Sequence, residues 1–319
     1  MLTQTPSKLG GWEDVLLIVA VGGLFGATFV LIKFALGSIP PFTLGWLRLI
    51  IASVPLLLVL RWQGLSLPRP GAVWLSFTVM GLGNGAVAYV LINWSAQHIE
   101  AGLAGILIAA TPLFTALLGQ FSAQGERMTL MRFLAVVVGF LGVVWLIGPD
   151  ALQGVGFRGM RLWGELGMLG AALCYAVAAI HGRTLQHVPP QITATAQQII
   201  GAVAMTPVVF AFESPLTLDP RWAHLLAVLA GGVFGTSLAY LLFFRLLARA
   251  GATRTILVTY ITPISALLFG AIFLGERVPL RAYGAIAVIL LSITLVSGRL
   301  DSAPGRIGKW FKRLGRSGQ

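Results

Sequence analysis

The chain repeats a pair of short motifs at matching points of its two halves. Thr-Pro and, 13 or 12 residues after the proline, Gly-Glu-Arg occur in both halves: 111–112 with 125–127, and 262–263 with 275–277. The Ala-Tyr pairs that precede them keep the same separation of 151 residues: 88–89 and 239–240. A repeat of this length constrains the fold more than any single motif, because it predicts two diverged copies of one structural unit.

Each copy holds five apolar runs that are long enough to cross a bilayer as helices. Of the 319 residues 57% are hydrophobic and 10% are charged, against a charged share of about 25% in soluble domains. The chain is therefore predicted to be an integral membrane protein. The expected spans are 15–36, 42–60, 72–94, 101–121, 131–148, 163–181, 192–212, 222–244, 253–274 and 281–298.

An odd number of spans in each copy means that the second copy enters the membrane in the opposite orientation. The predicted fold class is an all-α membrane protein with ten transmembrane helices arranged as two inverted five-helix repeats. The expected divisions are an N-terminal lead, the first repeat, a connecting loop, the second repeat and a basic tail: 1–14, 15–148, 149–162, 163–298 and 299–319.

The positive charge of the chain is distributed unevenly over the predicted topology. The net charge is +12, and with the N-terminus in the cytoplasm 15 of the 22 Lys and Arg residues fall on the cytoplasmic side. The positive-inside rule thus predicts that both termini are cytoplasmic. It also explains the basic composition without a nucleic-acid partner, and we expect none. The tail is expected to be either an amphipathic helix on the membrane surface or a disordered basic segment.

The sequence lacks the motifs of the common catalytic and metal sites. It has no Gly-x-Ser-x-Gly, phosphate loop, CxxC pair or His-x-x-x-His pattern, and only four histidines. We therefore expect no enzyme activity, no metal and no cofactor. All ten carboxylates fall in loops or at the ends of the expected spans. A membrane-embedded acid for proton or sodium coupling is therefore missing, and His181 is the main alternative proton carrier.

Polar side chains inside the spans are the candidates for a binding cavity, because polar groups in lipid need partners within the protein or water. Arg48 lies about two turns into its helix and is either a functional charge or a snorkelling, hydrogen-bonding side chain. The other candidates are hydroxyl and amide groups from several helices, among them tyrosines suited to an amino acid or a planar metabolite. They are Thr28, Asn84, Tyr89, Thr111, Tyr175, Tyr240 and Tyr260.

Two further features recur in both halves. Pro112 and Pro263 stand at matched positions and are expected to act as paired hinges, with carbonyl groups freed near residues 108 and 259. An architectural kink is the alternative. Glu126 and Glu276 of the Gly-Glu-Arg motifs are expected to be structural fasteners rather than gates.

These Gly-Glu-Arg passages and the segment Trp46-Leu47-Arg48-Leu49-Ile50-Ile51-Ala52 resemble the EamA family of the drug/metabolite transporter superfamily over residues 15–298. The resemblance implies a secondary transporter of a bacterial inner membrane that exports small metabolites such as amino acids by alternating access. It also implies a central cavity lined by helices 1, 3, 4, 6, 8 and 9, with 5 and 10 outside. The alternatives are a multidrug or nucleotide-sugar carrier, or a membrane enzyme or accessory subunit. The oligomeric state stays open, a monomer included.

Overall fold

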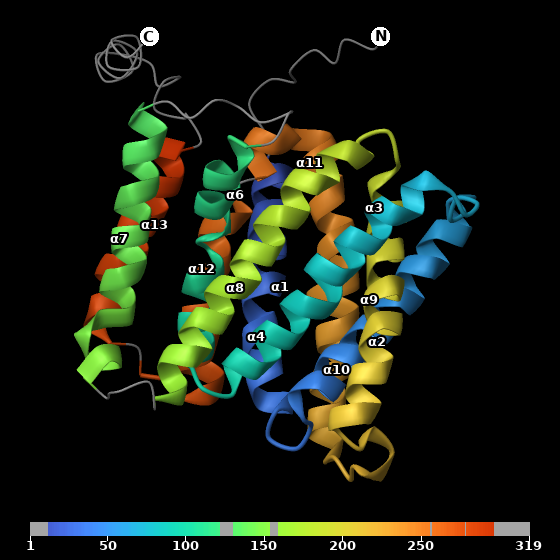
Figure 1. Cartoon of the computed structure of the whole chain (residues 1–319), viewed down its shortest axis with the longest axis horizontal. Coiled ribbons are helices and arrows are strands. Elements are labelled where there is room, and N and C mark those ends of the chain that lie inside the picture. The colour runs from blue at the N-terminus through green and yellow to red at the C-terminus, as the bar shows by residue number, and fades with distance from the viewer. Residues whose placement is uncertain (1–11, 122–129, 154–158, 256, 278, 297–319) are drawn as a thin grey trace.

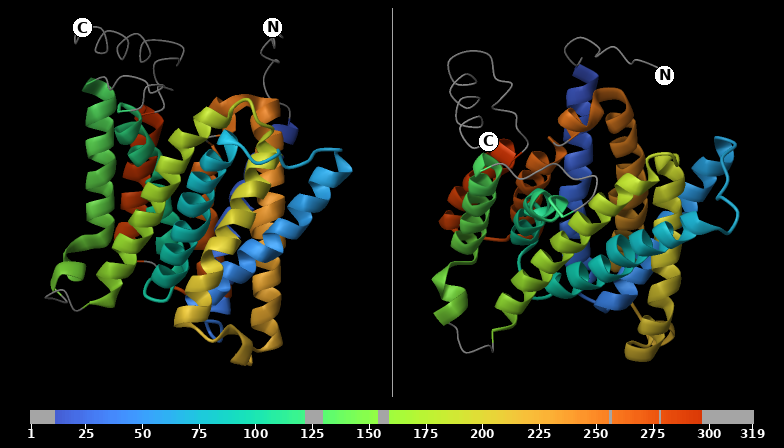
Figure 2. Two further views of the ribbon diagram at one scale, coloured as in Figure 1. Left: turned by 45° about the vertical axis from the view of Figure 1, so that its right-hand side comes forward. Right: turned by 45° about the horizontal axis from the view of Figure 1, so that its top comes forward.

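The computed structural model describes residues 12–121, 130–153, 159–255, 257–277 and 279–296. Within these ranges every regular element is a helix, and the helices form one bundle (Figure 1, Figure 2). The α-helices are α1 (Trp12–Ala35), α2 (Pro41–Trp62), α3 (Ala72–Met80), α4 (Ala88–Ala96), α5 (Ala101–Ile108), α6 (Thr111–Gly119), α7 (Leu130–Gln153), α8 (Met160–His181), α9 (Pro190–Phe212), α10 (Trp222–Gly232), α11 (Ala239–Thr255), α12 (Val258–Leu274) and α13 (Leu280–Val296). The basic tail and the first Gly-Glu-Arg motif lie outside the described residues.

Short π-helical and 3-10 segments lie between some of these helices. Two are π-helices, η1 (Gly81–Val87) and η4 (Val233–Leu238), and two are 3-10 turns, η2 (Gly182–Leu185) and η3 (Pro215–Thr217). Because η1 continues α3 into α4, and η4 continues α10 into α11, each series forms one long span.

The ten predicted spans are all present as apolar helical stretches. Seven stretches are long and apolar enough to cross a membrane, and three shorter apolar helices supply the other spans, within the residues that the structure describes. The fold class is confirmed: this is an all-helical, multi-pass membrane protein. The shorter helices are Phe133–Leu146, Val258–Leu274 and Leu280–Leu295.

The helices pack in the pairs that two inverted copies should form. Corresponding helices of the two halves contact each other: α2 with α9, α5 with α12, and α7 with α13. The contact of α1 with α12 is mirrored by the contacts of α8 with α5 and α6. Figure 1 shows α7 and α13 side by side at one edge of the bundle, as expected for the fifth helix of each copy.

The first helix lies very close to α12 because Gly26 carries no side chain. A Cβ atom at this position would lie 2.5 Å from the Cβ of Ser265 and 2.8 Å from the carbonyl oxygen of Thr262. Since real Cβ atoms do not approach other atoms so closely, any larger residue would push the two helices apart. This small-residue contact is typical of helix packing in membranes, and it holds one helix of each half against the other.

Some helix ends differ from the prediction. α11 continues to Thr255, although the eighth span was expected to end near 244, and α7 continues to Gln153 instead of ending at 148. α11 extends beyond the apolar run because hydropathy marks the part in the bilayer, while Ala, Leu and Arg also favour a helix in the interface. The two π-helices were not expected at all.

Candidate functional site

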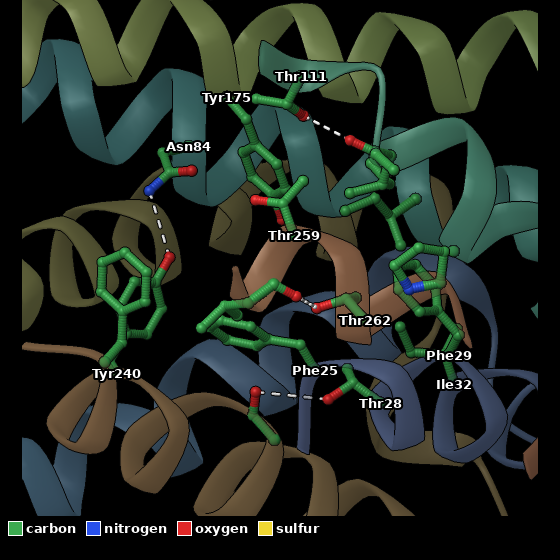
Figure 3. Close-up of a pocket in the computed structure, with 18 of the residues that line it drawn as sticks. Phe25, Thr28, Phe29, Ile32, Asn84, Thr111, Tyr175, Tyr240, Thr259 and Thr262 are labelled. Atoms are coloured by element: carbon green, nitrogen blue, oxygen red, sulfur yellow. Dashed lines mark hydrogen bonds between the residues drawn. The ribbon is translucent and has the colours of Figure 1, made fainter. Parts of the chain in front are cut away.

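A cavity of about 320 Å³ lies between the two halves (Figure 3). Its walls come from both copies, and within the described residues neither α7 nor α13 contributes to them. Most lining side chains are apolar, with a few hydroxyl and amide groups among them. The lining residues are Phe25, Thr28, Phe29, Ile32, Arg48, Asn84, Tyr89, Ile92, Gly105, Ile108, Ala109, Thr111, Pro112, Tyr175, Gly235, Tyr240, Phe243, Val258, Thr259, Thr262 and Pro263.

The structure brings nine of the ten candidate residues together around this cavity. They come from seven of the ten spans, which explains why no local motif joins them. These residues are Thr28, Arg48, Asn84, Tyr89, Thr111, Pro112, Tyr175, Tyr240 and Pro263. Whether they bind a cargo is a proposal developed below.

Tyr260 is the exception, and the prediction that it faces the cavity is wrong. Its hydroxyl lies 3.0 Å from the hydroxyl of Thr294 on α13, outside the cavity. Its neighbours Thr259, Thr262 and Pro263 line the cavity instead. Since successive helix positions are rotated by about 100°, a residue between them points to another face of α12.

The π-helices place polar groups in the cavity wall. Asn84 in η1 donates through Nδ2 to Gln197 Oε1 at 3.0 Å and to the Tyr240 hydroxyl at 3.4 Å, the second of which is visible in Figure 3. In the other half, η4 places the carbonyl of Gly235 3.4 Å from the hydroxyl of Thr28 on α1, which also donates to the carbonyl of Leu24 at 2.8 Å. π-Helical turns often occur at functional sites, and here both of them line the cavity.

Arg48 brings a positive charge to the cavity wall. The residue is only 5% exposed. Its guanidinium carbon lies 4.8 Å from the centre of the Tyr89 ring, a cation–π distance. Its Nη2 lies 3.4 Å from the Thr236 hydroxyl, and its buried Nε has no hydrogen-bond partner. Snorkelling therefore does not apply, because the head group lies inside the bundle, whereas the contact with Thr236 is a hydrogen bond to another helix, as the other alternative expected.

The helix interruptions at the two prolines are not equal. The fourth span is broken into α5 and α6 just before Pro112, whereas Pro263 lies inside the continuous helix α12. The expected free carbonyl at residue 108 is not available, because the Thr111 hydroxyl donates to it at 2.7 Å. In the second half Thr262 donates to the carbonyl of Val258 at 2.9 Å. The Thr262 hydroxyl therefore does not replace the amide hydrogen that the carbonyl of residue 259, four positions before Pro263, loses.

Sequence reasoning missed several lining residues. The apolar side chains Phe25, Phe29 and Phe243 cannot be told from lipid-facing ones by residue type. Thr259 and Thr262 could have been predicted, because both are hydroxyl residues in an apolar span within one turn before Pro263.

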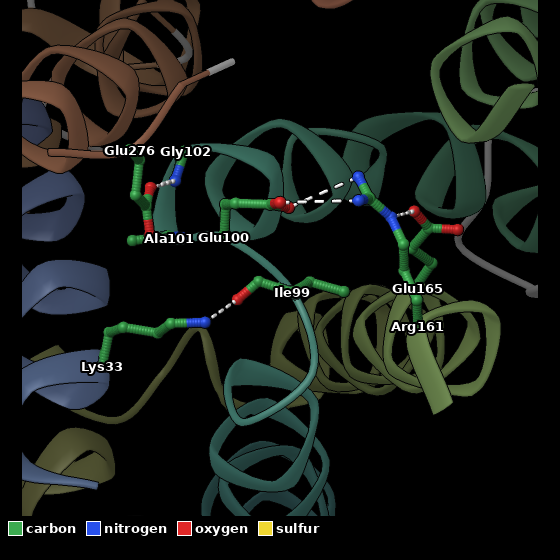
Figure 4. Close-up of polar contacts among 8 residues, drawn as sticks. All are labelled: Lys33, Ile99, Glu100, Ala101, Gly102, Arg161, Glu165 and Glu276. Carbon is green, nitrogen blue, oxygen red and sulfur yellow. Dashed lines mark hydrogen bonds and ion pairs between the residues drawn. The ribbon is translucent and has the colours of Figure 1, made fainter. Parts of the chain in front are cut away.

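One end of the bundle is tied across the two halves. This distal end is where α1 ends and α2 begins. There Glu276 accepts hydrogen bonds from the amides of Ala101 and Gly102 at 2.7 and 3.1 Å (Figure 4). Gly275 ends α12 with a left-handed φ of 65°, a conformation that suits glycine, and so turns Glu276 back toward α5. The interpretation of Glu276 as a fastener agrees with these contacts, while Glu126 lies outside the described residues.

Further contacts reinforce the distal end. Glu213, after α9, accepts from the amides of Phe42 and Thr43 at 3.0 and 2.7 Å, at the start of α2. Carboxylates at helix N-termini are favoured by both free amides and the helix dipole. Lys33 donates to the carbonyl of Ile99 (Figure 4). The contacts of Glu276 and Glu213 join the two halves, whereas Lys33 and Ile99 both belong to the first half.

Ionisable groups at the distal end also interact with each other. Arg161 bridges Glu100 and the fully buried Glu165, at 3.4 and 3.2 Å (Figure 4). Burial lowers the pKa of His98, and the positive charge of Lys33 lowers that pKa further. Both effects favour the neutral form of the His98 imidazole.

The opposite, proximal end has a different fastening. Arg249 on α11 pairs with Asp14 at 2.9 Å and with Glu13, both in the first turn of α1. No acidic residue lines the cavity between the two ends, in the part of the chain that the structure describes.

Comparison with known proteins agrees with this architecture. The profile of the EamA-like transporter family matches residues 13–148 and again 162–298. The chain is 26% identical over 265 residues to "Uncharacterized transporter YoaV" of Bacillus subtilis, which covers 83% of this chain and 89% of that protein. It is 25% identical over 280 residues to "Uncharacterized inner membrane transporter YedA" of Escherichia coli, with 86% and 87% covered.

Two further similarities extend the comparison. A WAT1-related chloroplastic protein of Arabidopsis thaliana is 26% identical over 280 residues, covering 86% of this chain and 66% of that protein. A protein of known crystal structure superposes with a TM-score of 0.65 at 21% identity, over 89% of this chain and 97% of that one. At this identity the solved structure shows the shared fold alone.

Proposed function

Because the chain belongs to the EamA-like transporter family, and is a transporter rather than an enzyme, we propose that it exports small metabolites, amino acids or related compounds, through the central cavity. The observation that carries the proposal is the cavity itself. Its volume of about 320 Å³ lies at the lower end of the range of about 300–1,000 Å³ for small-molecule sites. A largely apolar wall with a few polar groups is also the usual composition of such sites.

Transport proceeds by alternating access, in which the two inverted halves rock about the cavity. The support is that polar contacts between the halves hold both ends of the bundle. Glu276 and Glu213 hold the distal end, and Arg249 holds the proximal end. Breaking one set while keeping the other would open the cavity to one side at a time.

The membrane is a bacterial inner membrane, and both termini lie in the cytoplasm. The uneven distribution of Lys and Arg supports this orientation, which makes the distal end extracytoplasmic. We further propose that the repeats at 15–148 and 163–298 form the two moving halves and that one chain suffices, since residues of both halves of one chain line the cavity.

A flux screen in liposomes containing the purified full chain tests the proposal. Amino acids, lipophilic cations and nucleotide sugars would be offered separately, and we expect saturable flux of amino acids or related compounds. The variant Ala109→Phe, which fills the cavity, should abolish flux. Ala211→Phe, at an exposed position of α9, is the matched control and should transport normally.

The other outcomes of the screen separate the alternatives. Preferred flux of lipophilic cations or of nucleotide sugars would identify a multidrug or nucleotide-sugar carrier instead. Flux that survives Ala109→Phe would remove the cavity from the pathway.

A further inference from the structure

Arg48 is a buried charge without a charged partner. It belongs to α2, about two turns from the distal end of that helix, and its side chain reaches the cavity wall. Within the part of the chain described, none of the ion pairs includes it; the nearest polar partner is the Thr236 hydroxyl at 3.4 Å. A guanidinium has five N–H donors, and its buried Nε is unpartnered.

The protein surroundings of Arg48 offset its charge only in part. The face of the Tyr89 ring, 4.8 Å from the guanidinium carbon, supplies a cation–π contact. The Tyr89 hydroxyl lies 3.4 Å from the Thr236 hydroxyl, so both groups stand beside the guanidinium. A ring face cannot accept in-plane N–H bonds as a carboxylate does, and a lone ionised group in a low-dielectric interior is unfavourable unless it is paired.

The acidic residues whose side chains the structure describes do not reach this position. They stand in loops or in the first two turns of helices: Glu13, Asp14, Glu100, Glu165, Glu213, Asp219 and Glu276. None of them lines the cavity. The negative partner of Arg48 must therefore come from outside the described chain, and the cavity is the space through which it can arrive.

We propose that Arg48 is the recognition site for a single carboxylate of the cargo, with Tyr89 and Thr236 holding the guanidinium in place. This inference rests on the proposed transport function and deepens it by naming the charged group that is recognised. A planar guanidinium matches a carboxylate with two parallel hydrogen bonds. Phe25, Phe29 and Phe243 form apolar walls elsewhere in the cavity, suited to an aromatic or aliphatic body.

The absence of other charges in the described wall narrows the ligand class further. One cation can neutralise one carboxylate but not the two phosphates of a nucleotide sugar. With no acidic side chain in that wall, an ammonium group gains no ion pair. Monocarboxylates should therefore bind more tightly than zwitterionic amino acids of the same shape, and amines should bind least.

Four probes that share one ring test this ranking with the full chain in lipid nanodiscs: phenylacetate, L-phenylalanine, 2-phenylethanol and phenethylamine. Binding is measured by calorimetry at neutral pH. Phenylacetate should bind best, and its affinity should fall by about tenfold or more in Arg48→Met, as expected for loss of a charge-assisted bidentate contact. Arg48→Lys should recover part of the affinity, because it keeps the charge and loses the planar fork. Arg61→Gln, an exposed arginine on the same helix, is the matched control and should bind like the wild type.

The inference is overturned if phenethylamine or 2-phenylethanol binds as tightly as phenylacetate, if none of the four binds, or if Arg48→Met leaves phenylacetate affinity unchanged. Should Arg48→Met fail to fold, the ranking of the four probes on the wild-type protein decides. Flux measurements keep the two proposals apart. Arg48-dependent binding of phenylacetate without flux of any compound would refute transport and leave the carboxylate site standing. Flux that depends neither on the charge of the compound nor on Arg48 would support transport and refute the carboxylate site.

Discussion

Residue 112 shows how one side chain changes a helix. Proline has no amide hydrogen, so the carbonyl four residues earlier loses its helical partner. At Ile108 the hydroxyl of Thr111 takes the place of that amide, at 2.7 Å. The α-helical pattern is interrupted at Ala109 and Ala110, and α6 then starts at Thr111. The corresponding Pro263 lies inside α12, which continues without a break. We therefore expect a hinge at Pro112 and not at Pro263.

We predict that Pro112→Ala slows flux more strongly than Pro263→Ala. The first change restores an amide hydrogen for Ile108 and favours one continuous helix in place of α5 and α6. The second should raise the free energy of unfolding, by at most about 3 kcal/mol, because a proline inside a helix is unfavourable. Flux in liposomes and chemical unfolding of the purified variants measure the two effects.

Pro55→Ala is the matched control, since Pro55 lies inside α2 and outside the cavity wall. It should leave flux unchanged. Equal flux in Pro112→Ala and the wild type would reduce the break to architecture.

At the scale of helices, the two ends of the bundle are fastened by different chemistry. Each distal carboxylate, Glu276 and Glu213, binds two amides at the start of a helix from the other half. The proximal end uses ion pairs between side chains, and the distal end has one such pair between Arg161 and Glu100 besides its carboxylate–amide contacts. A carboxylate at a helix start is favoured by aligned backbone dipoles, and the backbone amides need no side-chain ordering. The distal contacts are therefore the more specific latch.

We predict that Glu276→Gln and Glu213→Gln each open the distal end more often, because an amide group accepts at one oxygen only and carries no charge. The loss of a charged hydrogen bond corresponds to about 1–3 kcal/mol for each site. The measurement is labelling of Ile32→Cys, a cavity residue near the end of α1, by a membrane-impermeant maleimide from the distal side. Cys174→Ala removes the native thiol beforehand.

The double variant should label faster than either single one. Asp219→Asn, an exposed acid in the distal loop between α9 and α10, serves as control and should label like its parent. Unchanged labelling in Glu276→Gln would show that the contact does not limit opening.

Sequence reasoning located these helices because bilayer thickness fixes the length of an apolar run. It did not locate the π-helices, since hydropathy does not show where backbone amides bond to carbonyls five residues back. In η4 two hydroxyl groups follow the same spacing. Thr236 donates to Gly231 and Ser237 to Gly232, both five residues back, at 3.1 Å. Ser237 also donates to Ala52 of α2 at 2.8 Å, a tertiary contact that no local pattern reveals. The same limit applies to Tyr260, whose hydroxyl contacts that of Thr294 on α13, another tertiary contact.

At the scale of the whole molecule, inverted symmetry accounts for the shape of the site. The duplicated motif and the odd number of spans predicted two inverted five-helix repeats, and the contacts between corresponding helices of the two halves agree with that arrangement. The cavity residues were predictable where a polar group stood in an apolar run. Arg48 entered the cavity from the second helix, which the family resemblance did not include. Symmetry alone does not predict the differences between the halves, such as the break before Pro112.

The charges of the whole molecule also decide how transport can be driven. Proton or sodium antiport usually relies on an acidic group within the membrane-embedded pathway, and no described acidic residue lines this one. The remaining candidate is His181 at the end of α8, whose Nε2 is buried without a hydrogen-bond partner. Because it is not among the residues of the cavity wall, a proton on His181 would not contact the cargo.

We therefore predict facilitated diffusion or exchange, driven by the cargo gradient. In liposomes loaded with a carried compound, counterflow should proceed at the same rate with and without an imposed proton gradient. His181→Ala should leave that rate unchanged, because a group outside the cavity wall has no part in carrying charge with the cargo. Counterflow that accelerates with the proton gradient in the wild type, and loses this response in His181→Ala, would assign proton coupling to the histidine. The exchange mechanism would then have to be abandoned.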